Sequence, residues 1–279
     1  MGGLIAVLLH RAGVAVVAVA RPSTARQITA EGLTLRSSQL GDGTSRLRAV
    51  TEIPAGARVI VATKAYTLPA LTDGIQRAHP IEVLSLLNGI EHMAVLRTAA
   101  PAALAAGCSV AVESTRLGPT VIDHRSPFLR LTVPATAQDT GIVAAWNHAG
   151  LDVTVGGTET EVLWSKLRFL APMALLTSYW QEPIGGARDR DPVLSGALLA
   201  EVADIATRDG VPSQPGQLAR ALAALPAQMR SSLQNDLAAG AENELDAIGG
   251  ALLRRADRQG ILAPRLREVV AVLASRPAR

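Results

Sequence analysis

Aromatic residues and cysteine are scarce in this chain of 279 residues. With 3 Trp, 2 Tyr and 2 Phe, the core must be filled by Ala, Val and Leu, and a protein that stacks nucleic-acid bases on aromatic rings is disfavoured. The single cysteine, Cys108, excludes an internal disulfide framework and a cysteine-based zinc site. We expect it to be a small core residue in a protein of the reducing cytoplasm.

The chain also lacks strong charge and long apolar runs. Its 27 basic and 24 acidic residues give a net charge of +3, and no Lys/Arg-rich run suggests a nucleic-acid partner. His10 and Arg11 interrupt the apolar N-terminal stretch, so neither a signal peptide nor a membrane span is predicted. The five histidines show no metal-ligand spacing, and we expect no metal. An apolar content of 48% excludes a disordered chain.

Lysine is the rarest of the common charged residues. Only Lys64 and Lys166 are lysines, and the other 25 basic residues are arginines. A GC-rich genome explains the arginines, and chance could have left two lysines. Arginine cannot release its proton in a protein, however, whereas a buried lysine can. The pair is therefore a candidate for chemistry that arginine cannot perform.

The N-terminal region resembles the second half of a βαβ unit. The pattern predicts a helix over Leu4–Arg11 and a buried strand over Val14–Ala20. Gly2 stands at the helix start, where backbone N–H groups can bind a phosphate. Arg21 follows the strand, at the position that accommodates the 2′-phosphate of NADP in dinucleotide-binding folds. A solvated arginine at a strand end is the alternative.

A dinucleotide fold also needs a first strand that ends in G-x-G-x-x-G, and only its third glycine, as Gly2, can be present here. We therefore expect that about ten residues, the central strand and the glycine turn, precede Met1 in a complete protein.

The rest of the chain divides in two by pattern. Strands are predicted over Arg58–Thr63 and Glu82–Leu87, followed directly by Lys64 and by an Asn88-Gly89 pair that could equally be an ordinary tight turn. Beyond residue 158 only helical periodicities remain, over 160–179, 192–209, 215–224, 243–259 and 264–274. The sequence thus predicts an α/β Rossmann-type NADP-binding domain over 1–158 and an all-α substrate and catalytic domain over 159–279.

Five motifs occur in an order that resembles the ketopantoate reductase (2-dehydropantoate 2-reductase) family over essentially the whole chain. They read VATKAYTL, LLNG, LWSKLRFLAPMALLTS, SSLQND and AENELDAIGGALLRRADRQGILAP. The resemblance implies NADPH-dependent reduction of a 2-keto acid, in pantothenate biosynthesis or with another substrate. It also implies a small-molecule substrate and a monomer or homodimer. The alternative is a catalytically weak NADP-binding paralogue that acts as a sensor.

The resemblance also assigns roles to residues. It implies Lys166 as general acid, with Glu244 ordering the catalytic site. It implies substrate binding by Lys166, Ser232 and Asn235, and cofactor binding by Gly2, Arg21, Lys64, Asn88 and Ser114. Both lysines thus fall on functional positions of the family.

The proposed acid fits the chemistry of ketone reduction. Negative charge develops on the ketone oxygen during hydride addition, and Lys166 can both stabilise it and supply the proton. A nearby Glu244 would favour the charged lysine against the desolvation that lowers its pKa.

The chain departs from the family in one part of the substrate pocket. Where the family commonly has three asparagines after the catalytic lysine, this sequence has Leu170, Ala174 and Ile184. A more apolar 2-keto acid than ketopantoate is therefore expected. Arg254 and Arg255, in contrast, are expected to form a solvated helix face.

Overall fold

The computed structural model describes residues 1–276 and separates into two compact units. The α/β unit comprises Met1–Thr63, Thr67–Leu87 and Met93–Val162. The helical unit comprises Lys64–Tyr66, Asn88–His92 and the described residues from Leu163 onward. Two short segments, one after each of two strands, thus make most of their contacts with the helices that follow much later in the chain.

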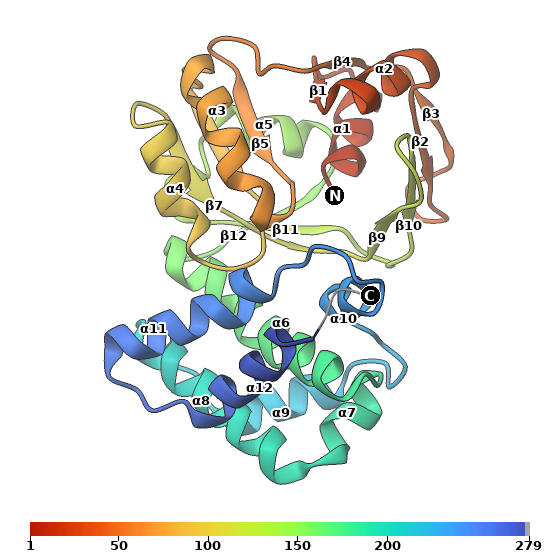
Figure 1. Cartoon of the computed structure of the whole chain (residues 1–279). Helices are drawn as coiled ribbons and strands as arrows, with labels where there is room; N and C mark the ends of the chain where they lie inside the picture. Colours follow the sequence, from red (N-terminus) through yellow and green to blue (C-terminus); the bar gives the residue numbers. More distant parts are fainter. Residues whose placement is uncertain (277–279) are drawn as a thin grey trace. The chain divides into compact units, whose positions relative to one another are not determined.

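The α/β unit contains short strands in four sheets (Figure 1). The strands are β1 (Val17–Val19), β2 (Leu33–Arg36), β3 (Gly43–Ser45), β4 (Arg48–Val50), β5 (Arg58–Val61), β6 (Glu82–Ser85), β7 (Leu104–Gly107), β8 (Ser109–Ala111), β9 (Ser114–Arg116), β10 (Val121–His124), β11 (Arg130–Val133) and β12 (Asp152–Val155). The sheet orders are β1-β4, β3-β2-β10-β9, β12-β11-β8 and β5-β6-β7.

Parallel pairing occurs where the sequence predicted buried strands. β5, β6 and β7 are parallel neighbours, with Arg58 opposite Glu82 and Glu82 opposite Leu104. The predicted strands over 58–63 and 82–87 end two residues early, because the chain then leaves the sheet toward Lys64 and Asn88. β1 pairs in parallel with β4 and is shorter than the predicted strand, which began at Val14.

Helices of the α/β unit pack on these sheets. They are α1 (Gly2–Arg11), α2 (Pro22–Glu31), α3 (Thr72–Ala78), α4 (His92–Ala99) and α5 (Gly141–His148), with 3₁₀ turns at Ala65–Leu71 and Ala135–Ala137. α1 buries Leu4, Ile5 and Val7, as its apolar pattern predicted, and contacts β1, β2, β3 and β10. Thr140 caps α5 by accepting a hydrogen bond from the Val143 N–H.

In the helical unit, α8 (Pro192–Arg208, teal in Figure 1) packs against four other helices. These are α7 (Ile184–Arg190), α9 (Pro215–Ala223), α11 (Ala251–Gln259) and α12 (Pro264–Ala274). α6 (Glu159–Trp180) and α10 (Ser232–Ala238) complete the unit. α12 has its predicted limits, because Pro264 fixes its first turn.

The predicted helix over 243–259 differs from the observed one. A π-helical turn over Asp246–Gly250 runs directly into α11, and Glu244 precedes the helical region. The Asn243 side chain accepts a hydrogen bond from the Leu245 N–H at 3.1 Å, so it caps the helix instead of belonging to it.

Each unit has its own hydrophobic core. Cys108 is buried in the core of the α/β unit, as predicted, and burial raises the pKa of its thiol to about 12. In the helical unit Ala174 and Ile184 are fully buried, while Leu170 is half-buried beside them. The side chains at these three positions therefore offer no polar group to a ligand.

Candidate active site

Helix α6 holds Lys166 between two buried anchors. Trp164 and Leu167 are each about 1% exposed, and the Trp164 Nε1–H donates to Asp209 at 2.8 Å. Lys166 itself is half-buried. The W-x-K-L spacing therefore fixes the helix at two points and leaves the lysine at the edge of the core.

Glu244 is the residue of the candidate site whose side chain contacts Lys64, Ala65 and Asn88. Its carboxylate accepts hydrogen bonds from the Ala65 N–H at 3.1 Å and from the Asn88 side-chain amide at 3.0 Å. The Lys64 ammonium lies 3.5 Å from the same carboxylate. Only 4% of the Glu244 side chain is exposed, and a carboxylate this buried needs such partners to remain charged.

Asp236 is a site residue that the sequence analysis missed. It lies on α10, one position after Asn235, and accepts a 2.8 Å hydrogen bond from the Lys64 ammonium. Its only signal in the sequence is its place in the SSLQND motif, because it follows Lys64 by 172 positions. Lys64 thus lies between two carboxylates.

The pKa values of the two lysines are shifted in opposite directions. Burial works to lower the pKa of Lys64, but the hydrogen bond to Asp236 and the charges of Glu244 and Asp236 outweigh it and raise the pKa. Burial lowers the pKa of Lys166 to about 8, and the charge of Glu244 only partly opposes this shift. Lys64 therefore stays a fixed cation near neutral pH, whereas Lys166 can give up its proton.

The Asn88-Gly89 pair is not an ordinary tight turn. Gly89 has a φ of +89°, and a Cβ there would lie 2.5 Å from the carbonyl oxygen of Ala247, in the π-helical turn. Only glycine permits this approach. It brings the residue before it, Asn88, to Glu244, and π-helical turns of this kind are frequent at functional sites.

Ser231 and Ser232, at the start of α10, have different roles. Ser231 is buried, accepts a hydrogen bond from the Gln234 N–H at 3.0 Å and shares one with the Thr177 hydroxyl at 2.8 Å. Ser231 therefore caps the helix. Ser232 and Asn235 are exposed on α10, as residues available to a ligand must be.

The candidate cofactor residues of the α/β unit lie at three places. At Gly2, the start of α1, a Cβ would lie 3.4 Å from Cβ of Ala62, just beyond the end of β5. Arg21 is exposed after β1, and no described residue forms an ion pair with it. The hydroxyl of Ser114, on β9, is buried with no hydrogen-bond partner in the described part of the chain.

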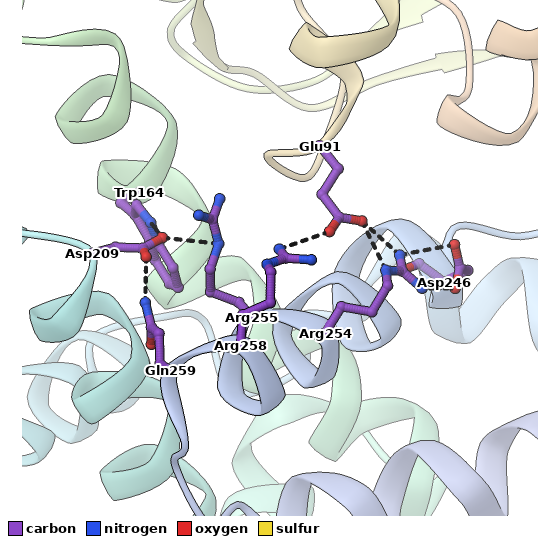
Figure 2. A network of polar contacts seen from close by, with 8 residues as sticks. All are labelled: Glu91, Trp164, Asp209, Asp246, Arg254, Arg255, Arg258 and Gln259. Atoms are coloured by element: carbon purple, nitrogen blue, oxygen red, sulfur yellow. Dashed lines mark hydrogen bonds and ion pairs between the residues drawn. The ribbon is translucent and has the colours of Figure 1, made fainter.

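The prediction that Arg254 and Arg255 form a solvated helix face holds for Arg254, whose side chain is 43% exposed, but it missed the carboxylates that pair with both arginines. The Arg254 guanidinium contacts Glu91 and Asp246, each at 2.7 Å, and Arg255 lies 3.2 Å from the buried Asp209 (Figure 2). Carboxylates from distant segments meet both arginines, which a reading of the helix alone could not show.

Within residues 1–276, no group of three or more His, Cys, Asp or Glu side chains could hold a metal ion. No helix in the same range has the length and apolarity needed to cross a bilayer.

Comparison with known proteins decides the family. Residues 1–138 match the family model described as ketopantoate reductase PanE/ApbA, and residues 160–276 match its C-terminal counterpart. The chain belongs to the ketopantoate reductase family. The predicted family, the predicted fold class of a Rossmann-type domain followed by helices, and the prediction of an oxidoreductase are thereby confirmed.

Individual relatives of this ketopantoate reductase family member are distant. The uncharacterized oxidoreductase YkpB of Bacillus subtilis strain 168 is 25% identical over 98% of this chain and 94% of its own. A 2-dehydropantoate 2-reductase of Halobacterium salinarum is 25% identical over 75% of this chain and 72% of its own. The crystal structure of a PanE/ApbA family ketopantoate reductase from Ralstonia eutropha JMP134 superposes with a TM-score of 0.85 at 26% identity, over 96% of this chain and 92% of its own.

Proposed function

We propose that this protein reduces a 2-keto acid to a 2-hydroxy acid with NADPH, and that Lys166 supplies the proton. The observation that carries the proposal is the environment of the two lysines. Lys64 contacts the Glu244 carboxylate directly, and the charge of that carboxylate also acts on Lys166. The pKa of Lys64 is raised, whereas that of Lys166 is lowered. A site with one permanent cation and one titrating ammonium suits a reaction that creates and then protonates an oxyanion.

The residues of the α/β unit fit a dinucleotide. The glycine-opened α1 beside the end of β5 offers backbone N–H groups to a phosphate. The exposed Arg21 has a guanidinium to pair with a 2′-phosphate, and the unpartnered Ser114 hydroxyl can hydrogen-bond a ligand. When bound, the nicotinamide would supply the hydride. A D-mandelate dehydrogenase that shares this fold has been solved in complex with NADH, so the preference for NADPH rests on Arg21.

Lys166 would act on the ketone oxygen. Its ammonium stabilises the negative charge that develops there, and one of its protons then moves to the oxygen, which leaves a neutral amine and a hydroxyl. A pKa of about 8 makes the ammonium the main form at neutral pH and still allows it to release the proton. An arginine in this place would keep its proton.

Lys64, Asn88 and Glu244 would order the site around this acid. Lys64 remains charged between Asp236 and Glu244, where it can attract an anionic substrate or cofactor group. Asn88 donates one amide hydrogen to Glu244, and its remaining amide groups stay available to a ligand. Ser232 and Asn235, exposed on α10, would bind the substrate carboxylate.

The substrate class follows from named relatives and from the apolar positions. Two relatives are named 2-dehydropantoate 2-reductase, which favours that keto acid and pantothenate biosynthesis. The half-buried Leu170 favours a 2-keto acid with an apolar substituent instead, while Ala174 and Ile184 lie within the core and add no polar group. We propose a cytoplasmic monomer or homodimer that acts on one of these small molecules.

The experiment is a panel of 2-keto acids, from ketopantoate to branched and aromatic ones, assayed with NADPH and with NADH. We expect reduction of at least one keto acid, faster with NADPH. If the protein binds NADPH and reduces none of them, it is a sensor or binding protein and the proposal is wrong.

A further inference from the structure

Glu91 lies three residues beyond Asn88 and is held by two arginines of α11. One of its carboxylate oxygens accepts from the Arg254 Nε–H at 2.9 Å and from a terminal N–H of Arg254 at 2.7 Å. Its other oxygen accepts from Arg258 at 3.2 Å. Burial works to raise the pKa of Glu91, but these hydrogen bonds outweigh it and lower the pKa, so the carboxylate stays ionised near neutral pH.

Arg254 joins Glu91 to the π-helical turn. A second pair of hydrogen bonds, at 2.7 and 3.1 Å, connects its guanidinium to the carboxylate of Asp246 (Figure 2). A guanidinium with two carboxylate partners has its planar fork fully used. Asp246 is the first residue of the π-helical turn and lies two positions after Glu244. The ion pairs therefore connect the segment that carries Asn88 with the segment that carries Glu244.

The two residues between Asn88 and Glu91 are also held by contacts with later parts of the chain. Ile90 packs against the hydrophobic core of the helical unit, and Gly89 lies against the Ala247 carbonyl. All four residues from Asn88 to Glu91 thus contact parts of the helical unit that follow much later in the chain. A free turn would instead lose the approach of the Asn88 amide to Glu244.

We propose that Glu91 is a positioning residue for the reduction: through Arg254 and Asp246 it clamps the Asn88 turn against the π-helical turn and fixes Glu244 where it faces both lysines. The inference rests on the proposed function for its effect on turnover. Its effect on the lysines needs no substrate and can be measured separately. Without the clamp, Glu244 would move away from Lys166 and support its charge less.

The test uses the rarity of lysine. In protein labelled with ¹³C-lysine, only two side chains give Cε signals, and Lys64→Arg assigns them. The signal of Lys166 is followed from pH 6 to 11 in the wild type and in Glu91→Ala and Arg254→Ala. The charged groups of the site are Glu244, Lys64 and Asp236, and the clamp adds Glu91, Asp246, Arg254 and Arg258.

The two variants remove opposite charges, which separates positioning from simple electrostatics. Loss of positioning lowers the midpoint of Lys166 in both, by about half a pH unit or more. A direct charge effect alone would lower it in Glu91→Ala and raise it in Arg254→Ala. Asp257→Ala is the matched control, because Asp257 lies on the same helix and its exposed ion pair is with Arg267, not with a residue of the clamp.

Turnover supplies the second readout. We expect kcat to fall about tenfold in both clamp variants, as for a slightly misplaced reacting group, and to be unchanged in Asp257→Ala. Equal midpoints in all proteins, or midpoints that move in opposite directions, would overturn the proposal. If an alanine variant does not fold, Glu91→Gln and Arg254→Gln make the same comparison. A wild type that reduces no keto acid would refute the proposed function, while the titration would still decide the clamp.

Discussion

The side-chain amide of Asn88 donates a 3.0 Å hydrogen bond to the carboxylate of Glu244, 156 residues later in the chain. The same carboxylate accepts from the backbone N–H of Ala65, so two segments that follow different strands meet at one side chain. Lys64 and Asn88 both contact this carboxylate.

Glu244→Gln should therefore disturb both lysines. Removing the negative charge lowers the pKa of Lys166 further and weakens the support of Lys64. We expect kcat for keto-acid reduction at pH 7.5 to fall by about tenfold to a thousandfold, as for the loss of a group that supports a positioned acid.

The matched control for this variant is Glu268→Gln, because Glu268 lies in the same unit and pairs with the exposed Arg265. Its turnover should equal that of the wild type. A Glu244→Gln protein with wild-type kcat would show that the Glu244 carboxylate has no part in the reaction.

The lowered pKa of Lys166 predicts a cost to stability at neutral pH. Because the folded-state pKa of about 8 lies below the usual value of 10.5, the folded protein holds this proton less tightly than the unfolded chain. The penalty is fully present below pH 8 and is relieved as the pH rises toward 10.5. Lys166→Met should thus raise the free energy of unfolding by about 1–3 kcal/mol at pH 7, and this gain should vanish near pH 10.5. Urea denaturation at the two pH values checks it, and a lower stability of Lys166→Met at pH 7 would contradict it.

Arg21 should set the choice of cofactor. Arg21→Asp replaces the guanidinium by a carboxylate that repels a 2′-phosphate and accepts from a 2′-hydroxyl. We expect the Kd for NADPH to rise about 100-fold, and the Kd for NADH to change by less than about threefold. Fluorescence titration with each cofactor measures both, and Arg26→Asp, on the neighbouring exposed part of α2, is the control. An equal loss for both cofactors would remove Arg21 from this role.

Gly89→Ala should loosen the turn that carries Asn88. The positive φ and the 2.5 Å approach to the Ala247 carbonyl leave no room for a methyl group. We expect a loss of about 1–3 kcal/mol of stability together with reduced turnover. Gly196→Ala is the matched control, because a Cβ there meets no atom within 4 Å, and it should be neutral or slightly stabilising. Equal thermal midpoints for the two variants would argue against the tight approach.

Local signals made much of this protein predictable. The apolar patterns gave α1, β5, β6 and α12, and the rarity of lysine directed attention to Lys64 and Lys166 before any contact was known. What the sequence could not give are pairings across long separations. Asp236 with Lys64 and Glu91 with Arg254 are pairs whose residue numbers differ by 172 and 163, so they depend on how the chain between them folds.

Some local features were also hidden from the sequence. The π-helical turn gives no periodicity different from that of an α-helix over so short a run, so a continuous helix from Asn243 was the natural prediction. The helices α2, α3, α4, α7 and α10 were missed, because α2 is polar and the other four have only seven or eight residues.

Proton donation by Lys166 is tested by kcat of wild type, Lys166→Ala and Lys166→Arg on the best keto acid with saturating NADPH. We predict that Lys166→Ala lowers kcat by about two to four orders of magnitude with little change in NADPH binding. Lys166→Arg should also stay well below wild type, because arginine keeps the charge and cannot transfer the proton. A kcat of Lys166→Ala within about twofold of wild type would contradict the account.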